Sequence, residues 1–267
     1  MKFSVIIPAR YASTRFPGKP LADVAGKPMV VRVAERARKS GAVEVIIATD
    51  HPRIATAAAR HGFAAVMTSR RHASGTDRIA EVAAMRRYRG THIVVNVQGD
   101  EPFMEAQTID QAIGACEEHQ GTIATLAGPI TTAEEFWDPN VVKVVMDRRG
   151  FALYFSRWPI PFMAGPEMSA AEIRRLSERA ATPTAGSCLK HLGLYVYPKS
   201  LLLELARSEP TPLECQERLE QLRALECGLP IYVELTEAAG MAVDTPADLE
   251  RARQLFARTR SATTRTV

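Results

Sequence analysis

Continuous apolar runs alternate with helical patterns through the first half of the chain, and this alternation constrains the fold more than any other feature. The runs are rich in valine, isoleucine and alanine, and they cover Phe3–Ile7, Val43–Ala48, Ala64–Met67, His92–Val97 and Thr122–Leu126. The helical patterns between them cover Met29–Lys39, Arg53–His61, Asp77–Tyr88 and Ile109–Glu118. Strands that are apolar on both faces and joined by helices are typical of a mostly parallel sheet with helices on both faces. The sequence therefore predicts an α/β fold whose strand-following loops meet at one edge.

The second half of the chain predicts a different arrangement. Val141–Asp147 and Phe151–Ser156 are separated by a short segment ending in glycine, which predicts a β-hairpin. The further predicted elements are strands over His191–Tyr197, Ile231–Leu235 and Met241–Val243, and helices over Ser169–Arg179, Leu201–Arg207, Leu213–Cys227 and Thr245–Arg258. We expect one domain over residues 1–258, with an excursion over about 141–197, and a disordered polar tail over 259–267.

Composition and charge exclude several classes of protein. A net charge of +4 in 267 residues is too small to indicate nucleic-acid binding, and the basic cluster Arg32–Lys39 is expected to be a solvated helix face. No signal-peptide pattern and no apolar run of membrane-spanning length is present, so no membrane partner is expected. The four cysteines lack Cys-x-x-Cys spacing, which predicts reduced thiols and a cytoplasmic location.

A cationic loop follows the first apolar run. Ile6–Lys19 contains Arg10, Arg15 and Lys19, and no carboxylate occurs from Met1 to Ala22. Arginine offers a planar fork to phosphate oxygens and lysine adds a compact charge, while nearby prolines and a glycine restrict the backbone. The loop has neither the Gly-x-Gly-x-x-Gly pattern of dinucleotide sites nor the Walker pattern of ATPases. It therefore predicts a polyphosphate-binding loop of another kind, with a merely solvated loop as the alternative.

Two carboxylates follow apolar strands further along the chain. Asp100 comes after His92–Val97 and a glycine, and Asp244 comes directly after Met241–Val243. Carboxylate oxygens near a polyphosphate are the ligands that Mg²⁺ prefers in proteins. The alternatives are a turn residue for Asp100 and a helix cap for Asp244.

Two further segments carry polar residues in suggestive places. His72–Arg78 is a turn of small residues in which Ser74 or Thr76 could contact a nucleotide or could cap the following helix. Arg157 ends a predicted hairpin strand, where it could bind a substrate carboxylate or pair with a surface acid.

Seven motifs together resemble the 3-deoxy-manno-octulosonate (Kdo) cytidylyltransferases, also called CMP-Kdo synthetases. These motifs are Ile6–Pro20, Asn96–Pro102, Tyr154–Arg157, His191–Tyr195, Pro212–Glu214, Leu219–Arg223 and Val243–Pro246. The resemblance runs from Phe3 to about Arg258 and implies a Rossmann-like nucleotidyltransferase sheet with a small β-hairpin dimerisation excursion. The segment Trp158–Ser187 matches no family pattern, which leaves the shape of the substrate lid and of the subunit contact undefined.

The resemblance also implies a role for individual residues. Arg10, Arg15 and Lys19 would hold the CTP phosphates, and with Asp100 they form the expected catalytic group. Asp100 and Asp244 would hold Mg²⁺. The nucleoside would lie against Ala9, Thr68, Ser74 and Gln98. The sugar acid would lie against Arg157, His191, Tyr195 and Glu214.

The implied reaction is the activation of Kdo by CTP to give CMP-Kdo and pyrophosphate, for lipopolysaccharide biosynthesis. The implied partners are CTP, Kdo and a second copy of the chain, with the hairpin half as the contact of a homodimer. The nearest alternative is the same chemistry on another acidic sugar, such as an amino-Kdo or a sialic-acid-like substrate. An alternative of another class is a nucleotide-binding protein without catalytic activity on the same fold.

Overall fold

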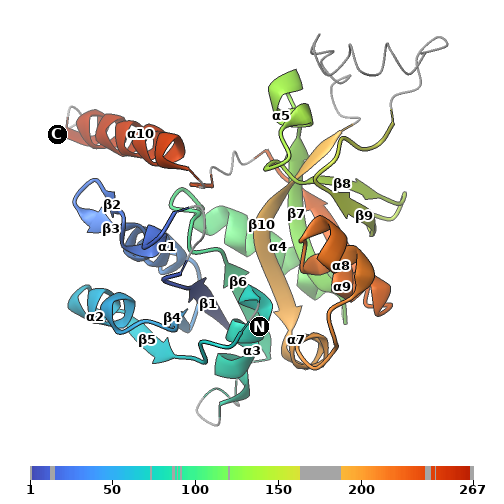
Figure 1. Ribbon diagram of the computed structural model, residues 1–267, viewed down its shortest axis with the longest axis horizontal. Helices are drawn as coiled ribbons and strands as arrows, with labels where there is room; N and C mark the ends of the chain where they lie inside the picture. Colours follow the sequence, from blue (N-terminus) through green and yellow to red (C-terminus); the bar gives the residue numbers. More distant parts are fainter. Residues whose placement is uncertain are drawn as a thin grey trace.

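A single large mixed sheet organises the molecule. The computed structural model describes residues 2–12, 16–72, 74–85, 88, 90, 92–119, 121–162, 188–237, 242–243 and 245–264. Within these residues nine strands form one sheet, and two very short strands, β2 (Asp23–Val24) and β3 (Lys27–Pro28), form a separate ribbon. The predicted α/β class is confirmed (Figure 1).

The strands of the large sheet follow the apolar runs of the sequence. They are β1 (Phe3–Ala9), β4 (Glu44–Thr49), β5 (Ala64–Met67), β6 (Ile93–Val97), β7 (Ile123–Pro129), β8 (Lys143–Met146), β9 (Ala152–Ser156), β10 (Leu189–Pro198) and β11 (Ile231–Leu235). Seven of them lie in the order β11-β7-β10-β6-β1-β4-β5. The pairs β6–β1, β1–β4, β4–β5 and β7–β11 are parallel, whereas β10 is antiparallel to both β6 and β7. Along this path of seven strands the sheet is therefore mostly parallel, with one inserted antiparallel strand.

Parallel pairing places the residues that follow four strands at one edge of the sheet. Residues Ser4–Ala9 of β1 pair with Glu44–Thr49 of β4, and residues of β5 continue the same register alongside β4. On the other side of β1, β6 runs in the same direction. Because ligands bind beyond the carboxyl ends of strands in open α/β sheets, this edge is where a site is expected.

Helices cover both faces of the sheet. One core cluster is built with α1 (Met29–Ala37), α2 (Pro52–Arg60) and α4 (Ala106–Glu118). The other is built with α3 (Gly75–Ala84), α7 (Lys199–Leu205) and α9 (Gln221–Glu226). Full burial of each Val or Ile side chain in such cores contributes about 1.5–3 kcal/mol, which explains why strands buried on both faces are continuously apolar.

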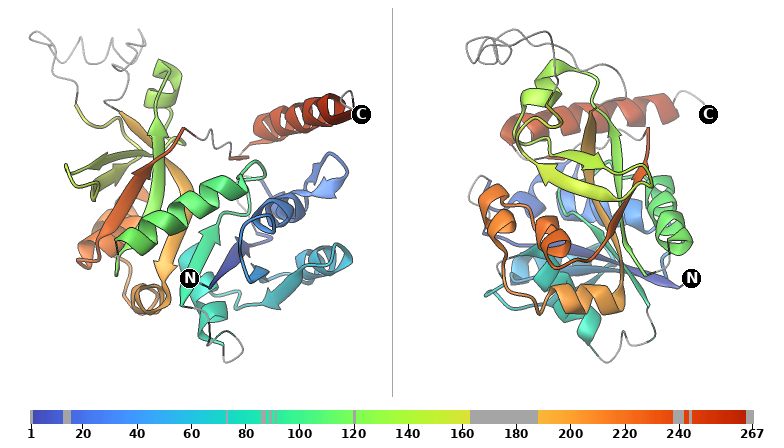
Figure 2. Two further views of the ribbon diagram at one scale, coloured as in Figure 1. Left: turned by 180° about the vertical axis from the view of Figure 1, so that it is seen from behind. Right: turned by 90° about the vertical axis from the view of Figure 1, so that its right-hand side faces the viewer.

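The predicted hairpin is confirmed and is joined to the large sheet. β8 and β9 pair antiparallel, and β8 also pairs with β10, so the hairpin extends the sheet beyond its main path. A short helix that the sequence analysis did not predict, α5 (Ala133–Trp137), precedes the hairpin. In Figure 2 this part of the molecule lies apart from α1 and α2.

The last helix packs beside the amino-terminal half. α10 (Pro246–Thr264) contributes Leu249 and Ala252 to a small core with Val24 of β2, and Phe256 stacks near Phe103. The view in Figure 2 shows α10 close to the β2–β3 ribbon. The helix extends to Thr264, so part of the segment predicted as a disordered tail is helical.

Three other predictions need correction or fall outside the described residues. Leu213–Cys227 is not one helix but two, α8 (Pro212–Glu217) and α9, because Arg218 adopts a left-handed conformation with φ 56° and ψ 47° that ends α8. Residues 242–243 are not in a strand. The predicted helix Ser169–Arg179 lies outside the described residues. No helix in the described part of the chain is long and apolar enough to cross a membrane.

Candidate active site

One polar cavity opens at the edge where the parallel strands end. Its volume is about 220 Å³. It is lined by residues from the ends of β1 and β6, from the 3-10 helix η1 (Lys19–Leu21), from the start of α3 and from the α8–α9 junction: Pro8, Ala9, Arg10, Lys19, Pro20, His72, Ser74, Gly75, Arg78, Gln98, Gly99, Asp100 and Glu220. The structure thus brings together Ala9, Arg10, Lys19, Ser74, Gln98 and Asp100, which the sequence analysis assigned to the phosphates, the nucleoside and the metal.

Two contacts fix the cationic loop that follows β1, one within the loop and one to Asp100. The Gly18 amide donates to the Tyr11 carbonyl at 3.1 Å, and Gly18 takes a positive φ of 74° beside the Tyr11 ring. This turn leads into η1 and points Lys19 toward Asp100, whose carboxylate accepts from the Lys19 ammonium at 2.6 Å. Arg15 lies outside the described residues, so its predicted phosphate contact stays a prediction.

The ends of β1 and β6 approach each other closely at Gly99. A Cβ atom at this position would lie 2.8 Å from the Pro8 carbonyl oxygen, a distance that real Cβ contacts do not reach. Glycine is therefore required here, because it lets Asp100 follow β6 directly beside the loop that follows β1.

The residues around Asp100 fit a divalent cation that is shared with a ligand. Asp100 lines the cavity, and the Val243 amide donates to the Asp100 carbonyl at 2.9 Å, which brings the residue before Asp244 to this place. Asp244 itself lies outside the described residues. No group of three or more His, Cys, Asp or Glu side chains in the described chain could hold a metal alone. A Mg²⁺ ion here would need further oxygens from phosphates and water, as is usual for that ion.

The side of the cavity that is predicted to bind the nucleoside is built around the start of α3. Ser74 caps the helix, since its hydroxyl accepts from the Asp77 amide at 3.0 Å. The alternative that Ser74 is a cap is therefore correct, and Ser74 also lines the cavity. Thr68 does not line it, but its hydroxyl accepts at 2.5 Å from Arg78, which does.

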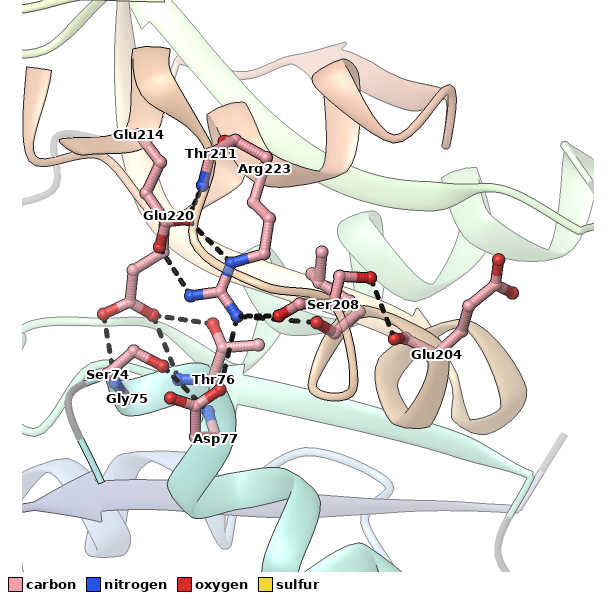
Figure 3. A network of polar contacts seen from close by, with 11 residues as sticks. Ser74, Gly75, Thr76, Asp77, Glu204, Ser208, Thr211, Glu214, Glu220 and Arg223 are labelled. Atoms are coloured by element: carbon pink, nitrogen blue, oxygen red, sulfur yellow. Dashed lines mark hydrogen bonds and ion pairs between the residues drawn. The ribbon is translucent and has the colours of Figure 1, made fainter. Parts of the chain in front are cut away.

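A network of hydrogen bonds fixes the start of α3 from the side of the α8–α9 junction (Figure 3). The Glu220 carboxylate accepts from the Gly75 amide at 3.0 Å, from the Thr76 amide at 3.0 Å and from the Thr76 hydroxyl at 2.6 Å. A carboxylate at a helix N-terminus is stabilised by the unpaired amides and by the helix dipole. Glu220 therefore holds the helix that carries Ser74, and it faces the cavity as well.

Arg223 continues this network and engages Glu214. Its guanidinium donates to both Glu214 carboxylate oxygens, at 2.7 and 2.6 Å, and reaches Asp77 of α3 at 3.5 Å (Figure 3). The hydrogen bonds that Arg223 donates to Glu214 raise the pKa of Arg223. Glu214 also completes a capping box with Thr211 at the start of α8. Its carboxylate is thus a structural partner in this structure, and its predicted sugar contact stays a prediction.

Arg157 is likewise engaged by its own chain. Its guanidinium donates to the carbonyl oxygens of Glu217 and Pro139, each at 2.9 Å, and its amide donates to the Glu217 carboxylate at 3.0 Å. These contacts tie the end of β9 to the end of α8. The predicted contact between Arg157 and a substrate carboxylate stays a prediction.

His191 and Tyr195 form a pair on β10 with ring centroids 5.1 Å apart. Thr125 lies within hydrogen-bond distance of His191 Nε2, at 3.0 Å, and Phe155 packs edge-on against the imidazole. Desolvation lowers the pKa of His191 to about 3, although the side chain keeps some exposure, so the ring is neutral at ordinary pH. Burial raises the pKa of Tyr195, whose buried hydroxyl lies beside Thr125.

The sequence analysis assigned no role to three residues that organise this site. Glu220 and Arg78 line the cavity, and Asp50 pairs with Arg78 at 3.2 Å. Asp50 had a usable signal, because it follows a predicted apolar strand just as Asp100 does. Glu220 lies within the motif Leu219–Arg223, but its link to α3 spans 145 residues of sequence and no local pattern indicates it.

A cationic loop after the first strand and a carboxylate after a neighbouring strand, converging on one cavity, define an α/β nucleotidyltransferase. The family model described as cytidylyltransferase matches residues 4–233. A 3-deoxy-manno-octulosonate cytidylyltransferase of Polynucleobacter necessarius is 50% identical over 258 residues, covering 96% of each chain. Another, of Geobacter sulfurreducens, is 50% identical over 253 residues, covering 94% of this chain and 98% of that protein.

A solved structure agrees with these relatives. The structure of a CMP:2-keto-3-deoxy-manno-octonic acid synthetase complexed with CTP is 38% identical, with a TM-score of 0.82, and covers 97% of this chain and 100% of that one. The chain therefore belongs to the cytidylyltransferase family and, within it, to the 3-deoxy-manno-octulosonate cytidylyltransferases. The resemblance drawn from the sequence motifs is confirmed.

Proposed function

We propose that this protein transfers a cytidylyl group from CTP to Kdo, giving CMP-Kdo and pyrophosphate. The observation that carries the proposal is the convergence of Arg10, Lys19 and Asp100 on the cavity that Ser74 and Gln98 also line. The reaction requires three kinds of group in one place: cations that bind phosphate, a carboxylate that binds metal, and polar groups that contact the cytosine base. The relatives that share about half of the sequence carry the name of this activity.

The reaction needs no covalent bond to the protein. The anomeric hydroxyl oxygen of Kdo attacks the α-phosphorus of CTP in line, and the bond from that phosphorus to the bridging oxygen of pyrophosphate breaks. The hydroxyl proton passes to solvent. Catalysis then consists of holding the two substrates in line and stabilising the charge on the departing pyrophosphate.

The described residues supply these two contributions. Arg10 and Lys19 bind phosphate oxygens, and the amide and hydroxyl groups of Gln98 and Ser74 orient the nucleoside. Lys19 pairs with Asp100 in this structure, and bound phosphates would place their oxygens beside the same ammonium group. Asp100 and Asp244 would hold Mg²⁺, which when bound would neutralise phosphate charge and lower the pKa of the attacking hydroxyl.

The sugar acid is proposed to lie on the β10 side of the cavity. Tyr195 and His191 support this placement, because their rings lie together on β10 with centroids 5.1 Å apart. His191, which is neutral, would act there as a hydrogen-bonding group rather than as a cation. Arg157 and Glu214 would have to exchange present bonds within the protein to reach a substrate.

A homodimer through the hairpin half is proposed as well. Leu153 of β9 is 62% exposed, and Trp158 and Phe162, which follow that strand, are 72% and 69% exposed. Large apolar side chains gathered on one segment are typical of a protein interface. Analytical ultracentrifugation of the wild type and of a Trp158→Glu variant tests the proposed dimer. We expect the wild type to sediment as a dimer and the variant to dissociate more readily. A monomeric wild type would exclude the dimer.

The function is tested by measuring pyrophosphate release from CTP and Mg²⁺ with a panel of acidic sugars. We expect release with Kdo and much slower release with an amino-Kdo or a sialic acid. Preferential release with another sugar would move the assignment to that substrate. CTP binding without release on any sugar would indicate a nucleotide-binding protein without this activity. The product of the proposed reaction would serve lipopolysaccharide biosynthesis, in the cytoplasm.

A further inference from the structure

We propose that Asp50 is a positioning residue that holds two segments in one fixed arrangement. One is the loop that follows β1, here called the phosphate loop, which Asp50 contacts at Tyr11. The other is the segment around Thr68 and Arg78, here called the nucleoside segment. Asp50 directly follows β4, which lies between β1 and β5 in the sheet. It is not among the residues that line the cavity. The inference rests on the proposed function, since it assigns those two segments to the two ends of CTP.

One carboxylate oxygen of Asp50 binds the phosphate loop. Its Oδ1 atom accepts from the Tyr11 amide at 3.2 Å, directly after Arg10 in the chain. The Tyr11 ring stacks on His51 with centroids 4.0 Å apart, and its hydroxyl accepts from Arg53 at 2.9 Å. Tyr11 is therefore fixed at its backbone and at its ring by residues that follow β4, which fixes where the loop leaves β1.

The other carboxylate oxygen binds the nucleoside side. Its Oδ2 atom accepts from the Arg78 guanidinium at 3.2 Å, and Arg78 donates to the Thr68 hydroxyl at 2.5 Å. The Asp50 carbonyl also accepts from Arg70 at 3.3 Å. Arg78 lines the cavity with only 3% of its side chain exposed, so the direct ion pair with Asp50 compensates a buried charge there.

A carboxylate suits this position better than any other side chain. The Asp50 side chain is 14% exposed and uses both oxygens, one on each segment, with a negative charge toward Arg78. An asparagine has a single acceptor oxygen and presents an amide donor on its other side. It can therefore hold Tyr11 or Arg78 but not both.

This arrangement predicts a selective effect on the nucleotide. CTP must contact the phosphate loop and the nucleoside segment at once, so allowing the two segments to move independently weakens both sets of contacts together. The sugar side on β10 makes no contact with Asp50 among the described hydrogen bonds. Loss of Asp50 should leave the affinity for the sugar unchanged at saturating CTP.

The test compares Asp50→Ala and Asp50→Asn with the wild type and with a matched control. Glu35→Ala is that control, because Glu35 also pairs with two cations, Lys27 and Arg32, but lies away from the cavity. Steady-state kinetics give the KM values for CTP and for Kdo. Hydrogen–deuterium exchange without nucleotide follows the peptides that contain Tyr11 and Thr68, with α4 as the internal reference.

We expect Asp50→Ala to raise the CTP KM by about tenfold or more, with the Kdo KM changed by less than about twofold. Exchange should increase at both peptides and not in α4, while Glu35→Ala changes neither readout. The inference is overturned if exchange increases equally everywhere, if it increases at neither peptide, or if both KM values rise together.

The Asp50→Asn variant tests the positioning role of Asp50 if the alanine variant does not fold. Because asparagine keeps one acceptor, we expect increased exchange at one of the two peptides and a smaller rise in the CTP KM. An asparagine variant identical to the wild type in both readouts would contradict the inference. The exchange measurement needs no turnover, so a wild type that releases no pyrophosphate would refute the proposed function while exchange still decides the role of Asp50.

Discussion

Two sides of the molecule differ in how they hold the residues predicted from the sequence. The nucleotide side is the cavity at the ends of β1 and β6, and the hairpin side is β8, β9 and helix α8, which contacts the end of β9. On the nucleotide side, Arg10 and Lys19, which follow β1, and Asp100, which follows β6, reach a common cavity. On the hairpin side, Arg157 and Glu214 are bonded to the protein itself, to backbone carbonyls and to Arg223. The comparison teaches that a parallel sheet brings side chains to one place through its topology, whereas Arg157 and Glu214 serve first to hold the hairpin and the α8–α9 junction together.

The largest expected effect is on the nucleotide side. Asp100→Ala should lower kcat/KM for pyrophosphate release by about 10³-fold, because under the proposed function it removes a charge that would organise the cation and the phosphates. Its side chain is partly exposed and pairs with Lys19, so we expect the variant to fold. The measurement is initial-rate kinetics with CTP, Kdo and Mg²⁺.

An exposed aspartate serves as the control for Asp100. Asp110 lies on the outer face of α4, and Asp110→Ala should keep wild-type kinetics. A fully active Asp100→Ala variant would remove the metal role of this residue and with it the contrast between the two sides.

An intermediate effect is expected on the hairpin side, and it concerns stability. Glu214→Ala should lower the free energy of unfolding by about 3 kcal/mol, because it leaves the Arg223 guanidinium buried without its main partner. The Arg223 side chain is 4% exposed and that of Glu214 is 10% exposed. Urea unfolding at neutral pH measures the loss.

Glu135→Ala is the matched control for Glu214. The Glu135–Lys190 pair is more exposed, at 29% and 21%, so its loss should cost less than about 1 kcal/mol. If Glu214→Ala keeps full stability and instead raises the KM for Kdo, then Glu214 is a sugar ligand and the two sides are alike.

The smallest expected effect concerns pH and His191. Its pKa is lowered to about 3 by desolvation, below the ordinary value of 6.5, so the unfolded chain binds the proton more readily than the folded chain. The resulting stability is present above pH 6.5 and is lost as the pH falls from there toward 3. Partial exposure of the side chain reduces the effect to about 1 kcal/mol between neutral and mildly acidic pH.

The measurement is the unfolding free energy of the wild type and of His191→Gln at several pH values between 7 and 4. We expect the glutamine variant to lose less stability on acidification than the wild type. Equal slopes for the two proteins would mean that the imidazole titrates normally and lies in a wetter place than the structure shows.

Much of the fold and of the nucleotide side could be predicted from the sequence. Apolar runs mark the strands because burial on both faces demands them, and parallel order then fixes where Arg10, Gln98 and Asp100 must meet. The start of α3 was marked by Ser74, whose capping role and cavity position are compatible.

The rest depends on contacts that no local pattern reveals. Helices α8 and α9 are separate because Arg218 adopts a left-handed conformation without being glycine, while the apolar spacing continues across the break. Glu220 reaches α3 across 145 residues of sequence. The pairing of Glu214 with Arg223 was equally invisible, because a glutamate in a helix can face a ligand, a partner or solvent.

Gly99 has a consequence for how such a site tolerates change. The missing side chain lets two backbones touch, so any replacement would push the ends of β1 and β6 apart and would alter both groups of ligand contacts at once. Gly114 in α4 has nothing within 4 Å of an added methyl group, and alanine there would even favour the helix. The outer helices of this protein can therefore accept substitutions. The distance between the ends of β1 and β6, by contrast, depends on position 99 having no Cβ atom.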